Sequence, residues 1–187
     1  MKEILGKYVI MNNLTVNALN PQIYQYFQIA DQDRSGRIDF RELNLALKND
    51  SNSNFSPESC RMMITLFDHS GDGQIDAHEF ERLWLFLGQW RQAFNSFDQD
   101  RSGEIDQNEL ASALSQMGYR FSLPFVQKSM MKFDITRRSA LSFDEFVRLC
   151  CVLQSLTQQF KMYDPQMSGR INVGYEQFLD MIFSSSI

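Results

Sequence analysis

The chain has 187 residues, of which 43% are hydrophobic and 22% charged, so it has enough apolar side chains to bury one substantial core or two packed lobes. Its formal net charge is -5 at pH 7, and its lysines and arginines are scattered rather than clustered, which gives no case for binding to nucleic acid. Its three cysteines do not fit a disulfide framework and favour a reducing compartment, so we expect a cytoplasmic protein.

Residues 1–20 precede the first predicted helix and are expected to form a short N-terminal segment. This segment has an apolar patch, but Lys7 interrupts its run and no small-residue cleavage site follows. We therefore expect neither a signal peptide nor a membrane span here. An amphipathic first helix remains an alternative for the segment.

A twelve-residue pattern of the EF-hand calcium-loop type follows, from Asp31 to Glu42. A Ca²⁺ ion needs about seven oxygen ligands at roughly 2.4 Å, from a chain that curls around it. The predicted ligands are three side chains at alternate positions, one backbone carbonyl and a closing bidentate glutamate: Asp31, Asp33, Ser35, Arg37 through its carbonyl, and Glu42. Glycine at position six supplies the turn with positive φ, and the bidentate glutamate favours Ca²⁺ over Mg²⁺.

The pattern recurs in full twice more. In the same order of positions, the second predicted site uses Asp68, Ser70, Asp72, Gln74 and Glu79, and the third uses Asp98, Asp100, Ser102, Glu104 and Glu109. Solvated turns rich in Asp, Ser and Gly are the alternative interpretation. Three complete matches, each with glycine at position six, an aliphatic residue at eight and glutamate at twelve, favour about three calcium ions per chain instead.

Two weaker copies follow, and their defects predict weaker or absent binding. In the stretch from Asp134 to Glu145, Arg138 stands where a ligand oxygen belongs and Ser139 stands where the turn favours glycine, so we expect no calcium there. In the stretch that begins at Asp164, position twelve is Tyr175 and the first glutamate comes one residue late. We expect that loop to be empty or weak.

The spacing of the loops predicts an all-α architecture of five helix-loop-helix hands with about eight helices. The loops begin at residues 31, 68, 98, 134 and 164, so the two steps of 30 residues each leave one continuous helix shared by adjacent hands, over 80–97 and 146–163. Both stretches carry an apolar stripe at helical spacing. The five hands are expected at about 22–50, 58–88, 88–118, 124–153 and 154–187, within one domain over 21–187.

Adjacent loops are expected to pair through a short antiparallel strand contact at position eight, because an isolated strand leaves backbone groups unsatisfied. Ile38 would then meet Ile75, and Ile105 would meet Leu141. The fifth hand has no mate within the chain and ends in an apolar helix, which predicts an isologous dimer through Ile171, Phe178 and Ile182. The alternative is that this helix folds back on its own core.

The arrangement resembles the penta-EF-hand family over nearly the whole chain, from about residue 21 to 183. The resemblance rests on the helix with Trp84 and Trp90, on Tyr119 and Arg120 after the third hand, and on the late glutamate after Tyr175. The C-terminal part is most similar to the apoptosis-linked-gene-two and peflin branch. Other family members are sorcin, grancalcin and the calpain regulatory subunits.

The resemblance implies a calcium-dependent adaptor that dimerises through its fifth hand, as a homodimer or with another penta-EF-hand chain. It also implies calcium-dependent binding of proline-rich peptides and an association with membranes that calcium promotes. The residues that would border or gate the peptide pocket are Trp90, Met117, Tyr119, Arg120, Phe121 and Tyr175, with Arg120 as the moving switch.

Two other functions remain open: a regulatory subunit of a calpain-like protease, and a calcium buffer. We expect no catalytic activity. His69 and His78 lie at non-ligand positions of the second loop, where solvent exposure is the default interpretation. Cys150 and Cys151 lie on or beside the apolar stripe of a predicted helix, where buried packing is favoured over a role as nucleophile.

Overall fold

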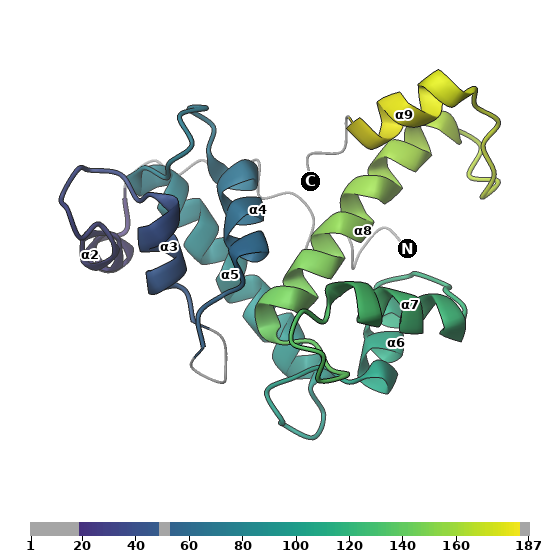
Figure 1. Ribbon diagram of the computed structural model, residues 1–187, viewed down its shortest axis with the longest axis horizontal. Coiled ribbons are helices and arrows are strands. Elements are labelled where there is room, and N and C mark those ends of the chain that lie inside the picture. The colour runs from purple at the N-terminus through teal and green to yellow at the C-terminus, as the bar shows by residue number, and fades with distance from the viewer. Residues whose placement is uncertain (1–18, 49–52, 184–187) are drawn as a thin grey trace.

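The computed structural model describes residues 19–48 and 53–183, which form eight helices and confirm the all-α prediction (Figure 1). The helices are α2 (Pro21–Ala30), α3 (Phe40–Ala46), α4 (Pro57–Phe67), α5 (Ala77–Phe97), α6 (Gln107–Gln116), α7 (Leu123–Phe133), α8 (Phe143–Tyr163) and α9 (Tyr175–Phe183). Most of the predicted N-terminal segment, with its alternative amphipathic helix, lies outside the described residues. Within the described ranges, no helix is both long and apolar enough to cross a membrane.

The helix that leaves each of the first three loops begins at an acidic cap. Asp39, Asp76 and Asp106 each precede a helix and accept a hydrogen bond from the backbone N–H three residues later. That later residue is a glutamate whose carboxylate accepts in return from the backbone N–H of the capping aspartate. Positions nine to twelve of the calcium-loop pattern are thus also a capping box, so the loop and its exiting helix are specified by the same residues.

The two long helices match the predicted shared helices but begin three residues earlier, at Ala77 and Phe143, because each capping residue lies inside the preceding loop. The apolar stripe of α5 is buried except for Trp84, which is 37% exposed and stacks on Tyr26 of α2 with ring centroids 4.6 Å apart. In α8, residues up to Leu153 are largely buried, whereas the remainder carries exposed apolar side chains. Figure 1 shows the reason: this half of α8 extends beyond α6 and α7 and contacts α9.

The predicted pairing of loops is confirmed for the first four hands. The backbone N–H of Ile38 donates to the carbonyl of Ile75 at 2.8 Å, and the reverse bond is 3.0 Å. Ile105 and Leu141 form the same two bonds at 2.8 and 2.9 Å. All four side chains are fully buried. Each pair of hands is therefore one lobe, with its two loops side by side.

The first residues of α8 join the two lobes. The Phe143 ring lies 5.8 Å from that of Phe55 and 5.5 Å from that of Phe94. Beside it, the Asp144 carboxylate accepts a 2.8 Å hydrogen bond from the backbone N–H of Ser56, the N-cap of α4, and is only 2% exposed. A buried carboxylate at a helix N-terminus is favoured by the helix dipole. Hand four, which is expected to bind no ion, therefore anchors the entering helix of hand two.

Replacing Asp144 with alanine should lower the free energy of unfolding by about 2 kcal/mol, because the partly buried N–H of Ser56 loses a charged acceptor. Asp144→Asn keeps an acceptor oxygen and should lose less. Urea unfolding followed by circular dichroism measures both, with Asp180→Ala on the exposed face of α9 as the control. Equal stability of Asp144→Ala and the control would contradict this role.

Candidate metal centres

The aspartate at position one organises each loop by accepting backbone hydrogen bonds from residues further along it. Asp31 accepts from the N–H groups of Ser35 at 3.0 Å and Gly36 at 2.9 Å. In the fourth hand, Asp134 accepts at 3.1 and 2.7 Å from the amides at the same two positions. The folded shape of the loop is therefore built from its own backbone in a hand predicted to bind calcium and in one predicted not to.

Positive φ at position six contributes to the curl of the loops. At position six, Gly36, Gly73 and Gly103 have φ of 81°, 79° and 80°. Ser139 takes the same place in hand four with φ of 62°, a conformation that costs a residue with a Cβ about 1 kcal/mol. Hand four thus keeps the loop conformation without the glycine that the sequence pattern requires.

The closing glutamate joins the two ends of its loop. In hand one, one Glu42 oxygen accepts from the N–H of Gln32 at 2.8 Å, and the other accepts from the N–H of Asp39 at 3.0 Å. Glu79, Glu109 and also Glu145 of hand four make the equivalent bonds. Both carboxylate oxygens therefore stand at the loop centre from the first turn of the exiting helix.

In hands one and three the predicted acidic ligands converge. Oxygen atoms of Asp31, Asp33 and Glu42 lie within 4.8 Å of one another, and those of Asp98, Asp100 and Glu109 do the same. Three carboxylates at this separation repel one another unless a cation lies among them, and oxygen is the donor that Ca²⁺ prefers. The residues present therefore fit the ion.

The carboxylates at position three are held in their charged form. Hydrogen bonding by the Ser35 side chain, and then by its backbone amide, lowers the pKa of Asp33 below its usual value. Ser102 lowers the pKa of Asp100 in the same way. Both carboxylates are therefore ionised at neutral pH and are ready to bind a cation.

Hand two is arranged differently, although its sequence pattern is complete. Its position-five aspartate, Asp72, forms an ion pair with Arg37 of the neighbouring loop, and its other oxygen accepts from the N–H of Gln74 at 3.0 Å. In the part of the chain that the structure describes, Asp68, Asp72 and Glu79 do not form a cluster of the kind seen in hands one and three.

The two remaining hands differ in how their sites are altered. In hand four, the Arg138 side chain donates to the Thr136 hydroxyl at 2.7 Å and pairs with Glu104, so a guanidinium lies among the ligand positions. In hand five, the position-twelve side chain, Tyr175, is 78% exposed and offers no carboxylate to the loop. Its first aspartate, Asp164, nevertheless accepts from the amides of Ser168 and Gly169.

The residues assigned to a peptide pocket fall into three places. Trp90 and Met117 are 3% exposed and lie in the core, whereas Arg120 is exposed after the end of α6. Tyr119 and Phe121 stack with centroids 5.0 Å apart. Tyr175 begins α9, which Figure 1 shows at the far end of α8 from α7.

Sequence reasoning missed a third member of this stack. Phe125 on α7 lies with its ring centroid 4.4 Å from that of Phe121 and is 40% exposed. Its signal was the apolar stretch on both sides of Pro124 at the start of α7. We call Tyr119, Phe121 and Phe125 the aromatic cluster.

Cys150, Cys151 and both histidines have the burial or exposure that sequence analysis expected. Cys60, Cys150 and Cys151 are buried free thiols, and both histidines are exposed. Burial raises the pKa of the Cys150 thiol and raises that of Cys151 to about 12. A thiolate nucleophile is therefore disfavoured at both positions near neutral pH.

Glu42→Gln, Glu79→Gln and Glu109→Gln should each weaken one calcium site by more than about tenfold, because a charged bidentate ligand is lost. Titration calorimetry of each variant should then count one fewer ion than the parent chain. Glu145→Gln in hand four is the matched control and should leave the number of ions unchanged. Three sites retained in the triple variant at positions 42, 79 and 109 would refute the ligand assignment.

The native thiols should react with iodoacetamide at pH 8 far more slowly than the exposed surface thiol of a Gln158→Cys control on the same helix as Cys150 and Cys151.

The raised pKa of Cys150 and Cys151 also makes the free energy of unfolding depend on pH, since only the unfolded chain ionises these thiols easily. Their stabilising contribution is complete below about pH 8.5 and is lost as pH rises through about 12 for Cys151. Unfolding measured from pH 7 to 11 should show this decline.

Comparison with known proteins agrees with the geometry. The EF-hand domain pair family matches residues 21–85 and 89–151. Peflin of Danio rerio is 44% identical over 162 residues, which cover 86% of this chain and 60% of peflin. Human sorcin is 35% identical over 167 residues, covering 87% of this chain and 82% of sorcin. The chain therefore spans about three fifths of the peflin that it matches and most of sorcin.

Among solved structures, a homolog of programmed cell death 6 protein from Leishmania major Friedlin aligns with a TM-score of 0.77 and 30% sequence identity. The alignment covers 88% of this chain and 94% of that structure. Fold, loop chemistry and sequence similarity lead to one conclusion: the chain belongs to the penta-EF-hand family of calcium-binding proteins, close to the peflin and programmed cell death 6 group.

Proposed function

We propose that this calcium-binding protein is a cytoplasmic sensor and adaptor that presents apolar surface to partner chains when hands one, two and three are loaded. The observation that carries this proposal is the aromatic cluster directly after the exiting helix of hand three, in which Phe121 and Phe125 are exposed. A buffer has no need for exposed aromatic rings at that place, whereas an adaptor does.

The path from the third site to the aromatic cluster is short. Glu109 is the third residue of α6, and Met117 caps the other end of the same ten-residue helix. The backbone N–H of Tyr119 donates to the carbonyl of Leu114, so the cluster is tied to the last turn of α6. When bound, the ion supplies a divalent charge that draws the ligand carboxylates together. A movement of Glu109 toward the loop would carry α6, and with it Tyr119.

The surface of the cluster suits an extended proline-rich segment. Phe121 and Phe125 are 36% and 40% exposed, and Leu123 between them is 53% exposed. Flat aromatic faces bind proline rings through apolar contact, and a proline-rich chain loses little conformational entropy on binding. Arg120 is exposed and directly precedes Phe121 in the chain. The family resemblance implies that Arg120 is the moving switch of the peptide pocket, and a position beside these rings suits that role.

Hand five supports a dimer through Ile171, Phe178 and Ile182. Met181 is buried, but Phe178 and Ile182 on the same helix are 49% and 42% exposed. Among the described residues Ile171 forms no β-bridge, unlike position eight of the other four hands. A second penta-EF-hand chain, identical or not, would supply that bridge and cover α9. A calpain-like catalytic partner would meet the same face, so co-expression separates the adaptor from a regulatory subunit.

The apolar surface also bears on membranes. Loading three ions would bring the net charge from -5 close to zero, which lowers repulsion from anionic lipid. We propose a calcium-dependent shift toward membranes on this basis.

The decisive experiment is calcium-dependent capture of a synthetic proline-rich peptide, followed by fluorescence anisotropy. Binding should require calcium and should weaken at least about tenfold in Phe121→Ala/Phe125→Ala, because two exposed rings are lost. Leu45→Ala, which removes a 51% exposed side chain from the other lobe, is the matched control. Glu109→Gln should abolish the response to calcium. Failure of calcium to raise either peptide binding or hydrophobic-dye fluorescence would count against the sensor and favour a buffer.

A further inference from the structure

Both pairs of loops contain an ion pair between the same two positions. In the first lobe, Arg37 at position seven of loop one pairs with Asp72 at position five of loop two. In the second lobe, Glu104 at position seven of loop three pairs with Arg138 at position five of loop four. The recurrence follows from the antiparallel bridges at position eight, which place the side chain at position seven beside the neighbouring loop. The two lobes differ in which position carries the base: it is position seven in the first lobe and position five in the second.

The first pair involves a predicted calcium ligand. One Asp72 oxygen accepts from the N–H of Gln74, and the other contacts the Arg37 guanidinium. Hands one and three carry serine, Ser35 and Ser102, at this position and so have no carboxylate there for a neighbouring cation to engage. They are also the two hands whose acidic ligands converge within 4.8 Å among the described residues.

Arg37 has a part in both sites of its lobe. Its backbone carbonyl is a predicted ligand of site one and already accepts from the Ser35 hydroxyl at 2.9 Å. Its side chain lies at site two. Fixing the carbonyl in site one keeps the guanidinium beside site two, so one residue links the two sites.

We infer that Arg37 sets the affinity of the second calcium site, by neutralising Asp72 in the empty loop and by holding a positive charge beside the ion in the loaded loop. This inference rests on the ligand sets assigned above. Site two is consequently the weakest of the three, and it fills last. Arg37 is a positioning residue for this site, since it acts through Asp72.

The second lobe supports this interpretation by showing the opposite outcome. Arg138 donates to Thr136 within its own loop and pairs with Glu104 of loop three. Loop four is closed by Glu145 with a cation of the chain itself among its ligand positions. A guanidinium at this place therefore satisfies the loop in lobe two, whereas in lobe one the guanidinium competes for a carboxylate that the ion also uses.

The expected effect is moderate, because the pair is partly open to solvent. The side chains of Arg37 and Asp72 are 41% and 34% exposed, so water and salt screen the guanidinium from the ion. Removing one charge that is screened to this extent changes the affinity of the site for a divalent ion by about three- to tenfold.

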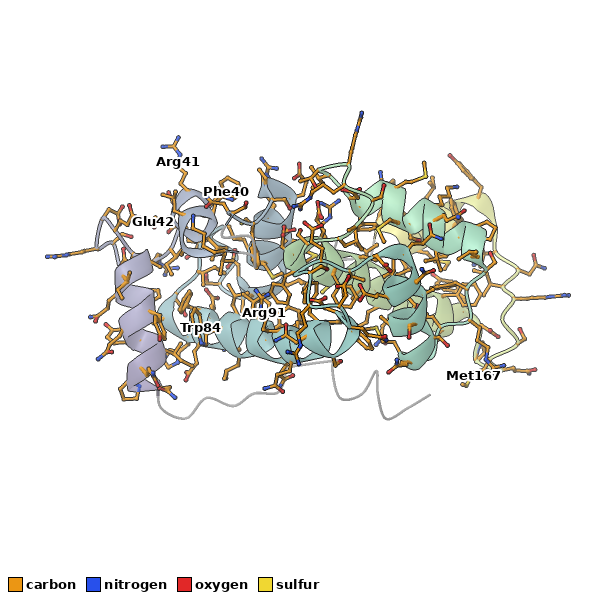
Figure 2. The ribbon with its side chains drawn as sticks, turned by 90° about the horizontal axis from the view of Figure 1, so that it is seen from below. Phe40, Arg41, Glu42, Trp84, Arg91 and Met167 are labelled. Atoms are coloured by element: carbon orange, nitrogen blue, oxygen red, sulfur yellow. The ribbon has the colours of Figure 1, made fainter. Side chains whose placement is uncertain are left out.

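The test measures site two alone in the full chain, in a Glu42→Gln/Glu109→Gln background. Calorimetry with Ca²⁺ then compares Arg37→Gln, Arg37→Lys and Arg41→Gln. Arg41 is exposed on the same hand, and Figure 2 shows it extending away from the body, so its substitution removes the same charge elsewhere. Arg37→Gln should tighten site two by about three- to tenfold at 0.1 M salt and by less at 0.5 M. Arg37→Lys and Arg41→Gln should leave the affinity near that of the background.

Unchanged or weaker binding in Arg37→Gln would overturn the inference, and so would equal tightening in Arg41→Gln. The same titrations separate this failure from failure of the site assignment. If the background itself binds no calcium, the ligand set of hand two is wrong. If it binds calcium but Arg37→Gln has no effect, the ligand set stands and Arg37 does not tune it.

Discussion

The closing glutamate is the contact on which the rest of the molecule depends. Its carboxylate belongs to the first turn of the exiting helix, yet it accepts hydrogen bonds from the amides at both ends of the loop, as Glu42 and Glu79 do. A helix N-terminus and a curled loop are thereby fixed by one side chain. In hand five the tyrosine in its place is exposed, and a weaker contact joins loop and helix, in which the side-chain oxygen of Gln177 accepts from the N–H of Gly174 at 3.0 Å. The exiting helix of this hand also leaves several apolar residues exposed.

Hand four keeps the loop conformation although a cation of the chain itself lies among its ligand positions. Glu145 closes it, Ser139 accepts the strained backbone of position six, and Leu141 pairs with Ile105. Its exiting helix then supplies Phe143 and Asp144 to the junction with the first lobe. Because hand four is predicted to bind no ion, its contribution to the junction requires no ion in its own loop.

Much of the fold was predictable from sequence, because the calcium loop is a local pattern. Residues within twelve consecutive positions specify both the loop and the start of the helix after it, and loop spacing then predicted the shared helices and the pairing of Ile38 with Ile75. Side-chain contacts between distant segments that the loop pattern does not specify were not predictable. The Asp144 bond to Ser56 spans 88 residues, and the Arg37 pair with Asp72 spans 35. Trp84 follows the apolar stripe of its helix, which predicts a buried side chain. Its ring instead stacks on Tyr26 of α2 and stays partly exposed, which the sequence pattern does not indicate.

The part of α8 beyond Leu153, which carries exposed apolar side chains, has a geometric consequence. The helix has 21 residues and is therefore about 31 Å long, but only its first half lies in the core. Figure 2 shows Met167, just beyond its end, at the opposite side of the molecule from Glu42. A tilt of about 10° at the base of such a rod displaces its tip by roughly 5 Å. A small change of tilt where α8 joins the two lobes would therefore be enlarged at the far end of the helix, and it would change where α9 can meet another molecule.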